Sequence, residues 1–114
     1  MLNIGRAYRK IVLNFGMPMG AAQLRHAVHA QHGGKATLVT KLPIKDIHDG
    51  QTVWEGVVYI FDLEGHPGAT GANAWSSLVE GSANRRFFSV LHLDGIRSPL
   101  DAVRAAIAIE HKAL

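Results

Sequence analysis

Apolar residues along this chain follow two different periods, and each period predicts a different kind of element. Near the N-terminus, helical spacing predicts a helix over residues 4–15, although the run IVLNF could instead form a short strand. Pro18 suits the first turn of a second helix over residues 18–32, which the pair Gly33-Gly34 ends.

Beyond Gly34 the apolar residues alternate with the period of two that is typical of strands. KATLVTKL predicts a strand over residues 35–42, and Pro43 ends this strand or marks it as a sheet edge. KDIHDGQT predicts a turn, with Asp49-Gly50 as the hairpin signal. Three further strands are predicted at residues 52–64, 69–77 and 85–94.

The last predicted element is a helix over residues 98–114. Ser98 is a good N-cap, Pro99 occupies the first helical position, and Asp101 lies three residues beyond the cap. The order of elements predicts a single α+β domain over residues 1–114, with a mainly antiparallel four-stranded sheet packed by N-terminal and C-terminal helices.

The strand over residues 52–64 is apolar on both of its faces, and Gly56 indicates a bulge within it. Trp54 and Val58 lie on one face, and Val57 and Tyr59 lie on the other. Three helices cannot easily cover both faces of a sheet in a chain of 114 residues. We therefore expect a homo-oligomer, and a dimer is favoured.

Composition narrows the class of protein. The chain is 47% hydrophobic and 18% charged, which is ordinary for a soluble globular protein. It contains no cysteine, which excludes a disulfide framework, a thiolate zinc site and a cysteine nucleophile. No apolar run approaches the roughly 18 residues needed to span a bilayer, and no secretory signal pattern is present. We expect a cytoplasmic protein without a membrane partner.

The charges are distributed unevenly along the sequence. Residues 1–45 contain seven lysines and arginines and no acid, whereas residues 46–114 contain five basic and nine acidic residues. A basic segment can attract nucleic acid or another polyanion. Such binding is an alternative function, although it is not the favoured one. Its candidate residues are Arg6, Arg9, Lys10, Arg25 and Lys35.

The segment EGHPGATGANAWSS, residues 64–77, has a glycine-rich composition without a phosphate-binding motif. It contains no lysine, and its glycine spacing does not match a dinucleotide fingerprint. The segment is therefore interpreted as a connector. His66 within it could act as an acid or base with Glu64 or Glu110, which would make the protein a small enzyme. A solvent-facing loop histidine is the simpler interpretation, so a non-catalytic protein is favoured.

Three histidines, His26, His29 and His32, recur every third residue of the second predicted helix. A third ligand at this spacing has rotated away from the first by too much to share one metal, and no carboxylate lies in the same helix. We therefore expect a solvated basic face, with no metal and no cofactor.

Aromatic residues on the predicted strands could line an apolar pocket near residues 64–77. Glu110 lies within the apolar arc of the last helix, where it would meet Arg85, Arg86 or a histidine, or fray at the helix end. The favoured function is a non-catalytic, self-associating binding module with a pocket for a small apolar ligand. The candidate pocket residues are Trp54, Tyr59, His66, Trp75 and Glu110.

Two blocks, VWEGVVYIFDLEGHPGATGANAWS and RRFFSVLHLDGIRSPLDAVRAAIAIE, resemble segments of small stand-alone bacterial proteins of the kind found in mobile integron gene cassettes. The resemblance covers residues 53–110. It implies no activity and no catalytic residues.

Overall fold

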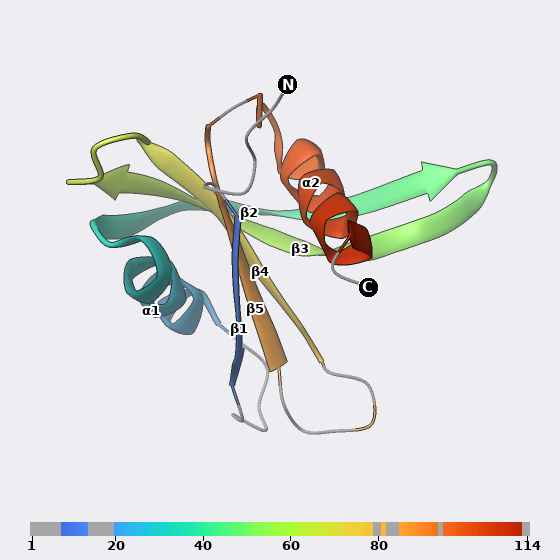
Figure 1. Cartoon of the computed structure of the whole chain (residues 1–114), viewed down its shortest axis with the longest axis horizontal. Helices are drawn as coiled ribbons and strands as arrows, with labels where there is room; N and C mark the ends of the chain where they lie inside the picture. The colour runs from blue at the N-terminus through green and yellow to red at the C-terminus, as the bar shows by residue number, and fades with distance from the viewer. Residues whose placement is uncertain (1–7, 14–19, 79–80, 82–84, 94, 113–114) are drawn as a thin grey trace.

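The computed structural model describes residues 8–13, 20–78, 81, 85–93 and 95–112. These residues form one five-stranded antiparallel sheet in the order β1-β5-β4-β3-β2, together with two helices (Figure 1). The elements are β1 (Tyr8–Leu13), α1 (Ala21–His32), β2 (Lys35–His48), β3 (Gln51–Glu64), β4 (Gly71–Leu78), β5 (Arg85–Leu91) and α2 (Pro99–Lys112). The predicted α+β class with an antiparallel sheet is confirmed.

The helix predicted over residues 4–15 is wrong where the structure describes it, and the alternative, a short strand in IVLNF, is confirmed for residues 11–13. Residues 8–13 form β1, which pairs antiparallel with β5 from Tyr8 opposite Val90 to Leu13 opposite Arg85. The run Ile-Val-Leu at residues 11–13 favours a strand because two of these side chains are β-branched. A partner strand far along the sequence then decides the conformation, so the sheet gains a fifth strand.

The next helix, α1, begins at Ala21 instead of near Pro18, which lies outside the described residues. Gly20 is its N-cap, and the Gln23 side chain accepts a hydrogen bond of 2.8 Å from the Gly20 backbone N–H. Gly33 ends the helix with a φ of 78°, a conformation that glycine adopts without strain.

A long hairpin joins β2 and β3. The turn is only Asp49 and Gly50, with φ values of 51° and 77°, which fits a type I′ turn. The Asp49-Gly50 signal is thus confirmed, but the predicted turn over KDIHDGQT is too long because β2 continues through Pro43 to His48. Pro43 marks an edge strand and does not end it.

Gly56 does not mark a bulge, because it pairs in regular register with Ile44. The register shifts lie instead between Leu38 and Thr40 and between Asp46 and Ile47. Gly56 has a different role: a Cβ atom there would lie 2.7 Å from Cη2 of Trp54. The absence of a side chain lets the indole ring lie over the strand.

The two helices cover opposite faces of the sheet (Figure 1). Neighbouring strand residues point to opposite faces, so Phe87 and Phe88 mark the two sides of β5. On the face of Phe87, the Ser89 hydroxyl donates a hydrogen bond to the Gln31 side chain of α1. On the other face, Phe88 and Val103 of α2 line the same cavity. We call these sides the α1 face and the α2 face.

The start of α2 agrees with the sequence. The Ser98 hydroxyl accepts a hydrogen bond of 3.1 Å from the Asp101 backbone N–H, and the Asp101 carboxylate accepts one of 3.1 Å from the Arg97 backbone N–H. Within the described residues, neither helix has the length and apolar character that crossing a membrane would require.

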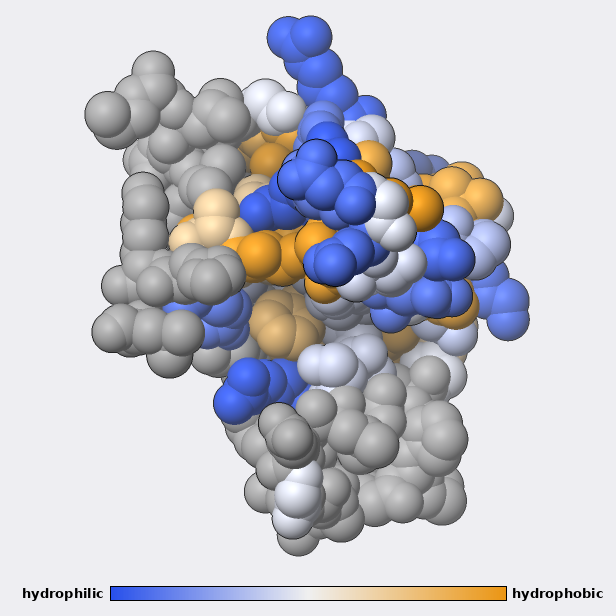
Figure 2. Space-filling model, turned by 90° about the vertical axis from the view of Figure 1, so that its right-hand side faces the viewer, coloured by the Kyte–Doolittle hydropathy of each residue, from blue (hydrophilic) through white to orange (hydrophobic). Residues whose placement is uncertain are grey.

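The hairpin extends beyond the rest of the sheet, because β4 pairs with β3 only from Tyr59 to Asp62. We call residues 42–58 the distal ribbon; its tip points toward the viewer in Figure 2, where orange apolar side chains lie between blue polar ones. All exposed large hydrophobic side chains of the described residues lie on β2 and β3. They are Leu38, Val39, Leu42, Ile47, Val53 and Val57.

Candidate functional site

An aromatic cluster lies on the α2 face, where three strands each contribute one ring. The rings of Trp75 and Phe88 stack with centroids 5.4 Å apart, and Trp54 meets Trp75 edge-on at 6.1 Å. Such pairs stabilise a core beyond the area that they bury. The rings border a cavity of about 160 Å³, whose other lining residues include Val103 and Glu110 of α2.

Glu110 lies at the edge of this cluster and contacts β1. The Tyr8 hydroxyl donates a hydrogen bond of 2.7 Å to Oε1 of Glu110. Burial raises the pKa of Tyr8, and the Glu110 carboxylate raises it further. The sequence-based expectation for Glu110, an arginine or histidine partner or a frayed end, did not include this tyrosine. Tyr8 was placed in a helix, and nothing local links residues this far apart.

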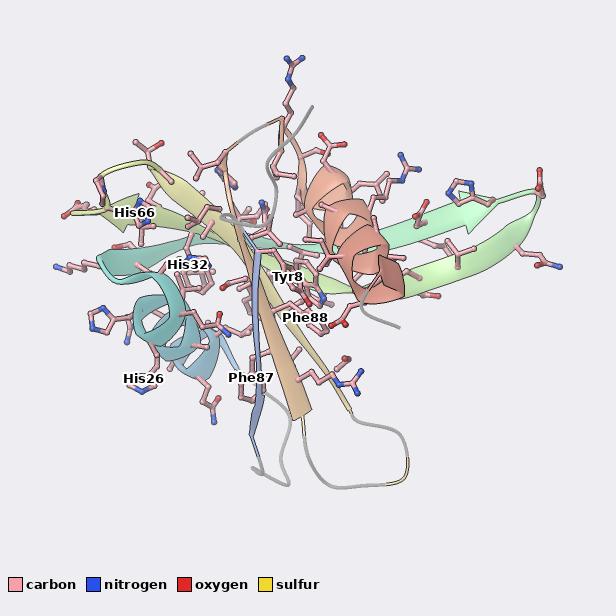
Figure 3. The ribbon with its side chains drawn as sticks, in the orientation of Figure 1. Tyr8, His26, His32, His66, Phe87 and Phe88 are labelled. Carbon is pink, nitrogen blue, oxygen red and sulfur yellow. The ribbon has the colours of Figure 1, made fainter. Side chains whose placement is uncertain are left out.

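The other two residues predicted for the aromatic pocket lie elsewhere. Tyr59 pairs with Ala74 and lies on the α1 face, where Nζ of Lys41 is 6.0 Å from the ring centroid. His66 lies in the loop between β3 and β4, apart from Tyr8 and Phe88 in Figure 3. The structure therefore brings together Trp54, Trp75 and Glu110 of the five predicted residues.

The loop around His66 is a connector, as its composition indicates. Gly65 has a φ of 81°, and Nδ1 of His66 accepts a hydrogen bond of 3.0 Å from the Gly68 backbone N–H. This bond closes a local turn. Glu64 is exposed at the end of β3, and Glu110 lies at the far end of α2 against Tyr8. The described contacts do not place either glutamate in one site with His66, so the geometry does not support the acid–base alternative.

A larger cleft, which we call the basic cleft, lies between α1 and the start of β2. Its volume is about 480 Å³, within the range of small-molecule sites. Two residues predicted for polyanion binding, Arg25 and Lys35, line it together. The complete lining is Ala22, Arg25, His26, His29, Gly34, Lys35 and Ala36.

The other residues of the polyanion hypothesis cannot be placed in this cleft. Arg6 lies outside the described residues. Arg9 and Lys10 belong to β1, and their side chains are not described. The sequence signal for this site is therefore Arg25 and Lys35 on either side of the Gly33-Gly34 turn.

The local backbone explains how a helix and a strand come so close. Gly34 has a φ of 78°, and a Cβ atom there would lie 2.7 Å from the Glu64 backbone oxygen. Only glycine fits this approach without displacing β3. Nδ1 of His29 donates a hydrogen bond to the Gly34 carbonyl oxygen, which holds the turn against the helix.

The cations of this cleft lack acidic partners within the described part of the chain. The ion pairs there all involve Asp46, which contacts Arg104 at 3.0 Å and His48 at 3.5 Å. Arg25 and Lys35 are exposed and belong to neither pair. Their charges remain available to an anion from solution.

The three helical histidines do not form a metal site. His26 lies on the outer side of α1, whereas His32 lies nearer the strands, with Nε2 3.5 Å from the Ser89 carbonyl oxygen (Figure 3). Across the described ranges, no group of three or more histidine or acidic side chains is arranged to hold a metal ion. His26 and His29 face the basic cleft instead.

No protein-family model, curated protein or solved structure matches this chain. The resemblance to integron-cassette proteins therefore stays a prediction.

Proposed function

We propose that this protein is a non-catalytic binding module that associates with a second copy of itself through an open edge of β3. The observation that supports this proposal is the unpaired part of that strand. From Gln51 to Val58, β3 pairs with β2 on one side and with no described strand on the other. Unpaired backbone N–H and C=O groups on an edge are a template for a further strand.

The outer edge of β2 is less suited to such pairing. Pro43 removes a backbone donor from it, and the register shift at Val39 distorts it. Lys35, Lys41 and Lys45 are exposed along the same strand. Proline, lysine and bulges are the features with which proteins protect an edge from other chains. Because β2 carries the proline and the lysines, we assign the interface to β3.

The open part of β3 carries fewer of those protective features, since its one irregularity is the register shift that leaves Val53 without a partner on β2. It contains no proline and no lysine, and its one charged residue is Glu55. Val53 and Val57 on this segment are 52% and 45% exposed. Two copies that pair antiparallel along this edge would form a two-fold interface and cover these valines.

The magnitudes indicate a weak dimer. Burying the exposed half of a valine contributes about 1 kcal/mol, so two valines from each copy contribute about 4 kcal/mol. Association costs roughly 4–15 kcal/mol in lost translation and rotation, and new strand hydrogen bonds must supply the remainder. The dimer population should therefore rise with concentration in the micromolar to millimolar range.

The sequence-based hypothesis also includes a small apolar ligand near Trp54 and Trp75. The cavity beside these rings is about 160 Å³, below the roughly 300 Å³ of typical ligand pockets. The cavity is better suited to core packing than to a ligand. We propose instead that a small ligand binds in the basic cleft.

Sedimentation equilibrium over a series of concentrations tests the self-association. The wild-type chain should approach twice its mass of 12.3 kDa at high concentration. Val53→Lys should remain monomeric, because it places a charge on the pairing edge. Val39→Lys is the matched control, since Val39 is equally exposed at 55% but lies on β2.

Two results would contradict the proposal. One is a wild-type protein that stays monomeric at millimolar concentration. The other is a dimer that Val39→Lys disrupts and Val53→Lys leaves intact, which would move the interface to β2.

A further inference from the structure

We infer that the cleft between α1 and β2 binds a small phosphorylated molecule, with Arg25 and Lys35 holding the phosphate. The inference names a ligand class for the binding module proposed above. It begins from the convergence of four nitrogen-bearing side chains, since Arg25, His26, His29 and Lys35 all line one cleft of about 480 Å³.

The chemistry of these side chains fits phosphate. Arginine offers a planar fork of N–H donors that matches two oxygens of a phosphate group, and lysine adds a compact positive charge. Both side chains are free of acidic partners among the described residues, so no internal ion pair must break before the anion binds. His26 and His29 add ring nitrogens along the same wall of α1.

The surrounding charges favour a compact anion over a long polyanion. Nucleic-acid binders neutralise several phosphates along an extended path. Here the nearest strand carries acids: in the β2–β3 register Glu64 lies opposite Lys35, with no ion pair between these two described residues, and Asp62 lies opposite Thr37. Both acids are exposed, so the positive surface at the cleft borders a negative one. A ligand with one or two phosphates fits this confined positive region.

The cleft is separate from the proposed dimer edge. It lies at the start of β2, whereas the unpaired part of β3 lies within the distal ribbon, opposite the later part of β2. Val53→Lys should therefore lose self-association and keep phosphate binding. This variant distinguishes a failure of one proposal from a failure of the other.

The probe is inorganic pyrophosphate, added to the ¹⁵N-labelled full chain at low ionic strength. We expect saturable amide shifts at Gly33, Gly34 and Ala36, with a dissociation constant of about 1 mM or tighter. Arg25→Gln should weaken binding by tenfold or more, because it removes a charge-assisted hydrogen bond. Arg25→Lys should recover only part of the loss, since it restores the charge without the fork.

Lys45→Gln is the control, because it removes the same charge from an exposed position on the distal ribbon. Its affinity should stay within about twofold of the wild type, since surface charges this far apart are screened. Circular dichroism checks that each variant is folded. If Arg25→Gln disturbs α1, Ala22→Glu provides a second test by placing a carboxylate in the cleft wall.

Three results would overturn the inference. Shifts that do not saturate, or that spread over all basic residues, would show general charge attraction only. Equal losses of pyrophosphate affinity in Arg25→Gln and Lys45→Gln would also show general charge attraction only. A single-stranded thymidine oligonucleotide that binds more tightly than pyrophosphate, with a steep dependence on salt, would identify a nucleic-acid surface instead.

Discussion

The two halves of β3 have similar apolar sequences and opposite environments. Phe61 and Leu63 near its end are 0% and 4% exposed, whereas Val53 and Val57 near its start are 52% and 45% exposed. The difference arises from neighbours: β4 pairs with the strand only from Tyr59 to Asp62. An apolar residue is buried only where the fold supplies something to cover it.

The contrast assigns different roles to the two halves. The end of β3 lies within the sheet between β2 and β4 and contributes to the core. The distal ribbon keeps one strand edge open and exposes Val53 and Val57, although Val58 on its other face is 0% exposed. Exposed apolar surfaces of this kind are typical of interaction sites. We therefore expect changes at the end of β3 to alter stability and changes at its start to alter association.

The largest expected effect comes from Phe61→Ala compared with Val57→Ala. Phe61→Ala removes a fully buried ring, which costs about 3–5 kcal/mol of the free energy of unfolding. Val57→Ala should change it by less than about 0.5 kcal/mol in dilute, monomeric protein, as at other exposed positions. Urea denaturation at low protein concentration measures both values.

Protein concentration gives a second test of the comparison between Val57→Ala and Phe61→Ala. If Val57 lies in a dimer interface, the cost of Val57→Ala should grow as protein concentration rises, because association stabilises the folded state. The cost of Phe61→Ala should be independent of concentration. A large, concentration-independent cost for Val57→Ala would contradict the division of β3 into two halves.

The sequence predicted best those features of the fold that depend on neighbouring residues. The Asp49-Gly50 turn and the Ser98 cap are local, and both are confirmed. The conformation of residues 8–13 depends on β5, some eighty positions away, and helical spacing predicted it wrongly. The contact between Tyr8 and Glu110 has the same cause, since the two residues are 102 positions apart.

The candidate sites show the same limit. Strand alternation already places Tyr59 and Trp54 on opposite faces, so one pocket could not hold both. By contrast, the ring contact between Trp54 and Trp75 depends on the register in which β3 pairs with β4, which the sequence did not predict. Arg25 and Lys35 were recognised by charge and the Gly33-Gly34 turn by composition, but the cleft that both side chains line is visible only in the structure.

The next effect concerns Asp46, the contact between the distal ribbon and α2. Asp46 is 2% exposed, and its carboxylate accepts hydrogen bonds from Nη2 and Nε of Arg104 at 3.0 and 3.4 Å. These bonds lower the pKa of Asp46. We expect Asp46→Asn to lower the melting temperature by less than Phe61→Ala does, because Asp46→Asn keeps the packing and removes only the charge.

The pH dependence follows from the direction of that pKa shift. The stabilisation by Asp46 is fully present above the ordinary pKa of 3.8 and is lost as the pH falls through the lowered value. Wild type should therefore lose more stability than Asp46→Asn over this acid range. Glu55→Gln is the control on the same ribbon, since Glu55 is exposed. Parallel acid curves for wild type and Asp46→Asn would contradict the role given to this carboxylate.

The smallest effect is expected from Gly56→Ala, which tests whether the base of the ribbon is held by packing. The new Cβ would lie 2.7 Å from Cη2 and 3.0 Å from Cζ2 of Trp54, so the ring must shift, which disturbs its edge contact with Trp75. Such overpacking costs about 1 kcal/mol or somewhat more, partly offset by the lower chain entropy of alanine. Gly68→Ala is the matched control, because its Cβ would meet only His66 at an ordinary 3.6 Å. Tryptophan fluorescence should shift in Gly56→Ala and stay unchanged in Gly68→Ala. If both variants melt and fluoresce like the wild type, the indole ring is loosely held, and the ribbon is anchored to the core by Asp46 more than by its aromatic base.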